Sequence, residues 1–169
     1  MLDLRSRVST LARWGALLLL PACADEPAPA SAYQGEPLAV LSEGCDPATL
    51  EGADQQPCVF IERFAVGEGP EAKTGDWVRF HYIAFVAEAG AEARALDDSH
   101  DVKPLSFKLG ESSDVIDGMH LGITGMKVGE RRRLRVPPRL GYQGRKISGI
   151  PPEAELVFLV EVMGIRPVE

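Results

Sequence analysis

Short stretches in which apolar and polar residues alternate, separated by glycine or proline, fill the chain from Val59 to Ile165. In the stretch 77–86, apolar side chains at 78, 80 and 82 alternate with Arg79 and His81. Successive side chains of a strand point to opposite faces, so this stretch predicts a strand with one buried face. The same pattern predicts strands over 59–65, 104–109, 130–136 and 154–165.

The last of these stretches is apolar on both faces apart from two glutamates, so we expect it to lie centrally in the sheet. The segment 112–125 favours one short helix, with a serine at 112 or 113 as its N-cap and Asp114 in its first turn. Three glycines lower its helix propensity, so this helix must depend on packing. The predicted fold class is α+β, a twisted antiparallel β-sheet wrapped around one short α-helix.

Length and composition limit the classes to which the chain can belong. Its 169 residues allow one ordinary domain with modest extensions. Hydrophobic residues make up 45% and charged residues 25%, which disfavours collagen-like, wholly disordered and polytopic membrane proteins. Acidic residues outnumber basic ones by 25 to 18, and the net charge of −7 argues against a nucleic-acid partner.

The N-terminus has the order of a signal peptide, with three arginines before the apolar run 14–20. That run is too short to span a bilayer as a helix. The sequence LPAC at 20–23 resembles the lipobox of bacterial lipoproteins. We therefore expect residues 1–22 to be a signal peptide and Cys23 to be lipidated, with a plain secretory signal and an incidental Cys23 as the alternative. The domain would then be anchored in the cell envelope and face the periplasm, with Ala24 favouring the outer membrane.

The segment 23–44 is rich in Pro, Ala and Glu near its start and predicts a flexible tether. Cys45 and Cys58 form an even pair in an exported chain, which favours a disulfide that closes the extension 45–57. Two free buried thiols are the alternative. The domain itself is expected over 58–166.

Common catalytic and metal-binding patterns are missing from the sequence. The three histidines lie in unrelated contexts and form no metal-ligand spacing. Neither a G-x-S-x-G elbow nor a glycine-rich phosphate loop is present. The basic run 131–135 has two interpretations, a solvated strand face or, together with Arg139, Arg145 and Lys146, a rim that binds acidic partners.

Three segments stand in a characteristic order: VIDGMHLGITGMKVGERRRLRVPP from Val115, LGYQG from Leu140, and GIPPEAELVFLVEV from Gly149. Together they resemble the FKBP-type peptidyl-prolyl cis-trans isomerase family, over roughly residues 59–165. The resemblance implies an enzyme that needs no metal or cofactor, because an apolar pocket favours the twisted, less dipolar X-Pro amide over the planar one. It also implies proline-containing client proteins as substrates and a pocket able to bind macrolides.

The resemblance assigns roles to eleven residues of this sequence. The catalytic group is Tyr82, Asp97, Ile116 through its backbone N–H, Tyr142 and Phe158, and the substrate-binding group is Leu96, Leu105, Phe107, Val115, Met119 and Ile150. For each of them the alternative is plain core packing. Where the family usually has Trp this chain has Met119, and at two usual Phe positions it has Leu96 and Leu105.

These departures lead us to expect weaker catalysis and weaker macrolide binding, because rigid aromatic surface is lost. The alternative function is therefore a catalytically weak binding or holdase chaperone module. The loop after Asp97 lacks the Arg that usually pairs with the pocket Asp, which leaves the partner of Asp97 open. Gln143 replaces a usual Gly after the tyrosine. The region between Cys23 and Cys58 is too short for a helical dimerisation module, so a monomer is expected.

Overall fold

The computed structural model describes residues 30–42, 44–52, 55–87, 93–111, 115–143, 145 and 147–168. The expected signal peptide 1–22, the expected lipidation site Cys23, the expected N-cap at Ser112 or Ser113 and the first-turn Asp114 lie outside these residues. Within the described residues, no helix is long and apolar enough to cross a membrane.

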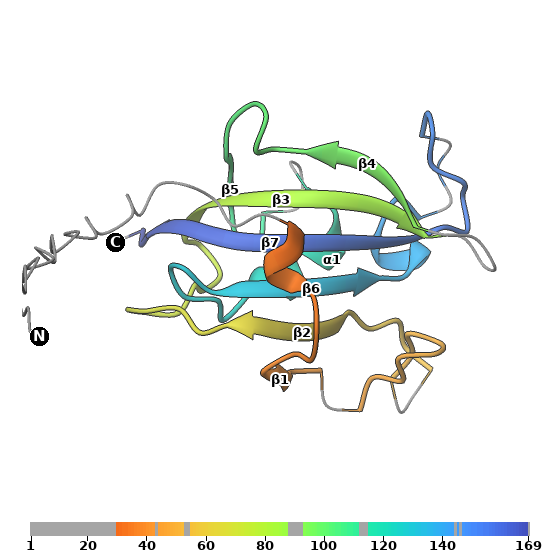
Figure 1. The fold of residues 1–169 in the computed structure, drawn as a ribbon, viewed down its shortest axis with the longest axis horizontal. Coiled ribbons are helices and arrows are strands. Elements are labelled where there is room, and N and C mark those ends of the chain that lie inside the picture. Colours follow the sequence, from red (N-terminus) through yellow and green to blue (C-terminus); the bar gives the residue numbers. More distant parts are fainter. Residues whose placement is uncertain are drawn as a thin grey trace, which may run out of the picture.

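An antiparallel seven-stranded sheet forms the body of the protein (Figure 1), in the order β1-β2-β6-β7-β3-β4, with β5 paired to β3. The strands are β1 (Ala39–Val40), β2 (Phe60–Ala65), β3 (Trp77–Ala87), β4 (Arg94–Asp98), β5 (Leu105–Lys108), β6 (Arg131–Val136) and β7 (Glu155–Arg166). The five predicted strands are present, and β7 lies centrally between β6 and β3 as expected. The fold class is confirmed. Alternation did not indicate β1 and β4, because β1 has two residues and β4 reads RALDD.

One short helix, α1 (Asp117–Ile123), packs on the inner face of the sheet. It begins later than the sequence predicts, after Ile116, whose side chain makes no cap hydrogen bond. Gly118 and Gly122 face β6 so closely that a Cβ at either position would lie 2.3 Å from a side-chain carbon of Val136 or Leu134. These glycines weaken the helix as an isolated segment, but they allow its backbone to approach the sheet.

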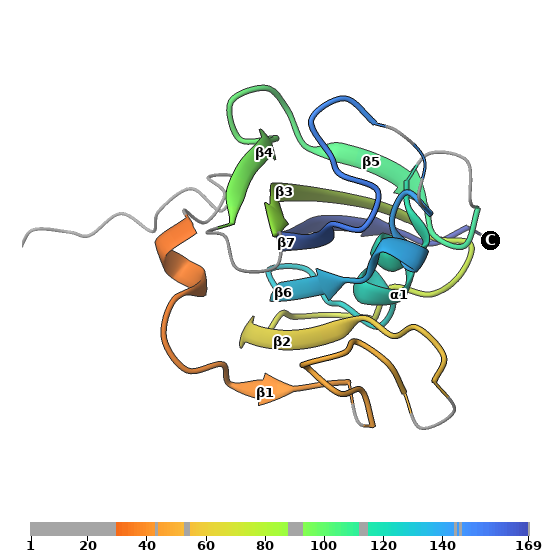
Figure 2. The same ribbon diagram turned by 90° about the vertical axis from the view of Figure 1, so that its right-hand side faces the viewer.

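Part of the outer face of the sheet is covered by residues 30–33, on the side opposite α1 (Figure 2). The short 3-10 helix η1 (Ala30–Tyr33) buries Tyr33, which is 3% exposed, against Ile83 and Leu159. The Tyr33 ring also lies 6.0 Å from that of Phe64, centroid to centroid. The expected tether 23–44 is therefore wrong from Ala30 onward, because an apolar outer face binds the only large aromatic side chain of this segment.

The outer face also corrects the interpretation of His81, which alternation places on a solvated side. His81 is 6% exposed, beneath the turn that follows β4. A period-two pattern shows which residues share a face, but it does not show whether a later segment covers that face.

The basic run on β6 is largely neutralised by glutamates. Arg133 forms two hydrogen bonds with Glu62 of β2, at 2.6 and 2.8 Å. Arg135 forms two with Glu155 of β7, at 2.5 and 3.0 Å. A further arginine, Arg132, is buried on the inner face with Glu130. Arg133 and Arg135 are therefore neither free to bind an acidic partner nor fully solvated, and Lys146 of the proposed rim lies outside the described residues.

The predicted disulfide between Cys45 and Cys58 is present, with its Cα atoms 6.0 Å apart. It closes a loop whose ends are 13 residues apart in sequence. The loop is held to the sheet where Arg135 Nη1 donates to the Pro47 carbonyl at 2.8 Å, and Leu50 of the loop is buried.

Removing this disulfide by the double substitution Cys45→Ser with Cys58→Ser should lower the free energy of unfolding by about 3 kcal/mol, because the unfolded chain regains the freedom of an open loop. Urea unfolding followed by circular dichroism measures the change, with the oxidised parent protein as the reference. An unchanged unfolding midpoint would show that the loop is ordered by its docking on β6 alone.

Candidate functional site

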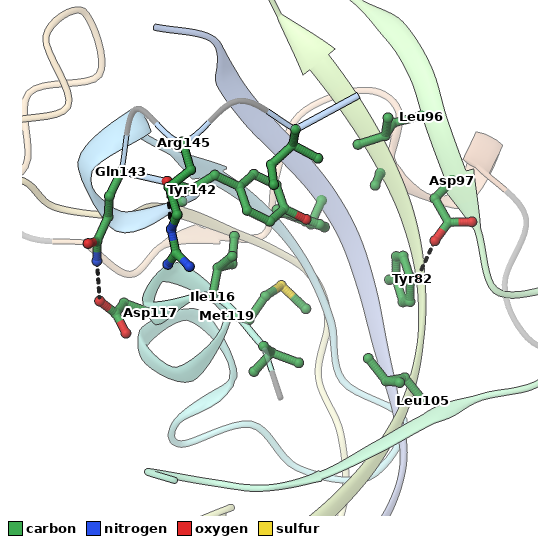
Figure 3. Close-up of a pocket in the computed structure, with 15 residues that line it drawn as sticks. Tyr82, Leu96, Asp97, Leu105, Ile116, Asp117, Met119, Tyr142, Gln143 and Arg145 are labelled. Carbon is green, nitrogen blue, oxygen red and sulfur yellow. Dashed lines mark hydrogen bonds between the residues drawn. The ribbon is translucent and has the colours of Figure 1, made fainter. Parts of the chain in front are cut away.

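A cavity of about 430 Å³ opens between α1, the inner face of β3 and β7, β4, and the loop that follows β6. Its lining is mainly apolar, with a few polar groups at its ends (Figure 3). The lining residues are Tyr82, Ala84, Leu96, Asp97, Leu105, Val115, Ile116, Asp117, Met119, Gly141, Tyr142, Gln143, Arg145, Ile147 and Phe158.

The floor of the cavity is formed by Phe158 of β7 and Met119 of α1, both buried. The ring of Tyr82 meets that of Phe158 at 6.4 Å between centroids and an interplanar angle of 62°. Edge-on aromatic contacts of this kind hold both rings in place and leave ring faces for a ligand. The cavity therefore offers a rigid apolar surface on one side and a flexible thioether on the other.

Most residues that the resemblance singles out line this cavity, but two lie behind it. Phe107 is fully buried between Phe80, at 5.5 Å, and His120, at 5.0 Å between ring centroids. Ile150 is buried in the core beyond the loop and is not among the lining residues. These two side chains support the pocket walls in this structure, whereas the sequence assigns them to the substrate-binding group.

The partner of Asp97, which the sequence leaves open, is Tyr82. The Tyr82 hydroxyl donates to Asp97 Oδ2 at 2.5 Å. Burial, reinforced by this hydrogen bond to the carboxylate, raises the pKa of Tyr82 above its ordinary value. The phenol therefore stays protonated at neutral pH, and one wall of the pocket is a fixed Tyr82–Asp97 pair.

The opposite end of the cavity is formed by the loop that carries Tyr142. After the 3-10 turn η2 (Pro138–Leu140), the backbone N–H of Gln143 donates to the Pro138 carbonyl at 2.9 Å. This bond places Gln143 at φ 54°, a left-handed conformation that glycine adopts without strain. Its side-chain Nε2 reaches Asp117 Oδ2 at 3.3 Å.

Several lining residues were not predicted from the sequence. Asp117 and Arg145 line the cavity on the same side as Tyr142 (Figure 3), and Ile147 is a further lining residue. Arg94 of β4 donates to the Gly149 carbonyl and so connects β4 to the loop between η2 and β7. In the sequence, only the replacement of a usual Gly by Gln143 indicated that this end of the pocket is unusual. The other contacts join segments far apart in the chain, so no local pattern indicates them.

No three His, Cys, Asp or Glu side chains among the described residues form a group that could hold a metal ion. What the cavity can do follows from its surface: it can remove an uncharged planar group from water and offer it a few hydrogen-bond donors at the rim.

The chain matches a known protein family. The model of the FKBP-type peptidyl-prolyl cis-trans isomerase family matches residues 69–163, which is more than half of the chain. The chain belongs to this family. The matched span runs from the turn before β3 to Met163 in β7 and includes the parts of β3, β4, β5 and β7 that line the cavity.

Two curated relatives illustrate the similarity. FK506-binding protein 3 of Yarrowia lipolytica is 39% identical over 108 residues, which cover 64% of this chain and 25% of the relative. FK506-binding protein 4 of Aspergillus fumigatus is 36% identical over 115 residues, which cover 68% of this chain and 22% of the relative. The chain thus spans about a quarter of the length of these FKBP relatives.

Among solved structures, the chain is similar to the crystal structure of FkpA from Escherichia coli, with a TM-score of 0.58 and 27% sequence identity. The similarity covers 76% of this chain and 55% of that one. The FKBP fold that the sequence predicts is therefore confirmed both by the family match and by this neighbour.

Proposed function

We propose that this chain accelerates the cis-trans isomerisation of X-Pro bonds in client polypeptides. The observation that carries the proposal is the apolar cavity closed by Phe158 and Met119, in a chain of the isomerase family. Rotation of an X-Pro amide has a barrier of about 18–20 kcal/mol because conjugation is lost in the twisted state. The twisted amide is less dipolar than the planar one, so a pocket that excludes water favours the transition state over the ground state.

The residues of the cavity divide this work between them. The proline ring would lie against Phe158 and Met119, with Val115 at its side. The hydroxyl of Tyr142 and the backbone N–H of Ile116, the residue before α1, would donate to carbonyls of the client chain. Asp97 holds Tyr82 in place, and together they form the other wall. No step needs a nucleophile, because no covalent bond is made or broken.

Substituting Tyr142→Phe tests this division of roles. We expect kcat/KM to fall by about tenfold, the equivalent of one hydrogen bond to the client, while the melting temperature stays the same because Tyr142 is only half-buried. A protease-coupled assay on a proline-containing peptide measures the rate. Unchanged activity in Tyr142→Phe would remove its hydroxyl from the mechanism.

A binding or holdase module is the second candidate function. It is favoured by the apolar rim at the cavity mouth, where Leu105 and Ile147 are each 38% exposed, and by the methionine at its floor. The two functions differ in one assay: acceleration of the proline-peptide reaction above background supports the isomerase, whereas client binding without acceleration supports the holdase. Macrolide binding, weaker than in relatives with more aromatic pockets, is part of the same proposal and is measurable by competition with a proline peptide.

We also propose that the domain acts as a monomer at the cell envelope, exported and anchored through a lipid on Cys23, with the outer membrane favoured. The support is the signal-peptide order of residues 1–22 and the sequence LPAC at 20–23. A disulfide between Cys45 and Cys58 is consistent with an oxidising compartment. Mass spectrometry of the mature N-terminus decides between an acylated Cys23 and a plain secreted chain.

A further inference from the structure

Directly behind the Tyr82 wall, on the outer side of β3, lies a group of polar residues that the mechanism does not use. Ser99, which is 6% exposed, holds the backbone of Tyr82. The Ser99 Oγ accepts from the Tyr82 N–H at 2.8 Å and donates to the Tyr82 carbonyl at 3.1 Å. The same oxygen lies 3.0 Å from Nδ1 of His81. One hydroxyl therefore joins the pocket residue Tyr82 to its buried neighbour His81.

A second histidine lies over the first. The rings of His81 and His100 are stacked, with their centroids 4.8 Å apart and an interplanar angle of 20°. Nδ1 of His100 is paired with Asp98 Oδ1, and the backbone N–H of His100 donates to the same oxygen at 2.9 Å. A positive charge on His81 would lie directly beneath the His100 ring, and this neighbour opposes charging of His81.

The charges around His81 come from β3 itself, from β4 and the turn after it, and from β7. Burial lowers the pKa of His81, and His100 and Arg79 lower it further, whereas Glu161 of β7 and Asp98 of β4 raise it. Burial raises the pKa of Asp98, but the hydrogen bonds from His100 outweigh it and leave that pKa below its ordinary value. The folded protein therefore favours a neutral His81 and an ionised Asp98.

We propose that Ser99 and His81 are positioning residues for the Tyr82–Asp97 wall of the pocket, and that acidification releases this wall by charging His81 beside His100. With the Ser99 proton on the Tyr82 carbonyl, Nδ1 of His81 donates to Ser99 Oγ, and Nε2 remains to take up a proton. The charged ring is repelled by His100, and Ser99 loses the neighbour that orients its hydroxyl. Because Tyr82 and Asp97 are adjacent to His81 and Asp98 in sequence, movement on one face is transmitted to the other.

The direction of the pH effect follows from the pKa shift. The pKa of His81 is lower in the folded than in the unfolded chain, so its contribution to stability is fully present above the unfolded pKa of about 6.5. This contribution is lost as the pH falls through that value toward the depressed pKa of the folded state. Release of the wall should therefore occur on the acid side of about pH 6.5.

The experiment measures kcat/KM for a proline peptide from about pH 7.5 to pH 5. NMR exchange is the method, because it needs no coupling protease whose own activity changes with pH. Since kcat/KM is the readout, this test rests on the proposed isomerase function. We expect wild-type kcat/KM to fall by about fivefold or more over this range, while the folded fraction stays constant. The profile of His81→Gln should be flat, because glutamine does not titrate. In His100→Asn the acid fall should be smaller than in the wild type, because the ring that repels a charged His81 is gone.

Ser99→Ala should lower kcat/KM at every pH, whereas Ser106→Ala, the same change at an exposed site on β5, should not. If the acid fall in kcat/KM is the same in His81→Gln as in the wild type, the proposal is wrong.

A second readout keeps this inference separate from the proposed function. The Tyr82 N–H donates to Ser99 Oγ, so its hydrogen-exchange rate reports on this bond. In the wild type, acidification should speed this exchange relative to the intrinsic rate at the same pH. In His81→Gln it should not. If the chain has no isomerase activity, the proposed function fails, and the amide still decides the inference. An amide equally protected at both ends of the pH range would overturn it.

Discussion

Replacing Arg132 with alanine should lower the free energy of unfolding by about 3–5 kcal/mol, because a buried carboxylate then loses its counter-charge. Arg132 and Glu130 are 5% and 2% exposed, and Nε of Arg132 donates to Glu130 Oε1 at 2.8 Å. Nη1 of Arg132 also donates to the carbonyls of Gly122 and Thr124, at 2.8 and 3.0 Å. The substitution thus leaves two carbonyls at the end of α1 without this donor, as well as Glu130 without its counter-charge.

Urea unfolding with circular dichroism measures this loss. Arg139→Ala is the matched control, because Arg139 is exposed on η2 and should change stability by no more than about 0.5 kcal/mol. Arg132→Lys keeps the charge but not the several donors of the guanidinium group. Its loss of unfolding free energy should therefore lie between those of Arg132→Ala and Arg139→Ala. If Arg132→Ala were as stable as Arg139→Ala, the buried pair of Arg132 and Glu130 would not contribute to stability, contrary to this prediction.

Substituting Gly118→Ala should destabilise the protein by about 2–3 kcal/mol, although alanine is the better helix former by about 1 kcal/mol. The added Cβ would lie 2.3 Å from Cγ1 and 2.9 Å from Cγ2 of Val136, a fully buried side chain. Either α1 or β6 has to move. Because α1 also carries Met119 into the pocket, kcat/KM should fall together with stability.

Thermal unfolding and the isomerase assay measure the two effects. Gly164→Ala in β7 is the matched control, because its Cβ would meet nothing closer than 3.9 Å. The double substitution Gly118→Ala with Val136→Ala should be more stable than the two single losses predict by addition, since the second change makes room for the first. Strict additivity, or a stabilised Gly118→Ala, would contradict the close approach of α1 to β6.

The five main strands and the existence of one helix could be predicted because each is a local pattern. Alternation over 77–86 and 130–136 follows directly from the geometry of a strand, and the two-sided apolar stretch 154–165 has no stable place except the middle of a sheet. The start of α1 could not be predicted, because its N-terminus has no side-chain cap and is set by how Ile116 meets the pocket. β4 has no pattern of its own and exists because β3 offers it an edge.

The pocket was predicted in its composition but not in its detail. The motif around Tyr142 and Phe158 indicates the residue types that a proline ring needs, and they line one cavity. Arg94 at Gly149, Gln143 at Asp117 and Tyr82 at Asp97 could not be predicted as pairs, because each contact joins segments 15 to 55 residues apart.

By itself the sequence determined the family, the positions of the five main strands along the chain and the apolar chemistry of the site, since these depend on local periodicity and on motifs of fixed spacing. The tertiary structure alone decided which polar residues are buried. Tyr33 is buried because Ile83 and Leu159 form an apolar patch on the outer face, and His81 because the turn after β4 folds over it. Arg132 points inward because Glu130 and two helix carbonyls receive its donors. Burial is a property of what packs against a residue, and for these three side chains the partner comes from another segment of the fold.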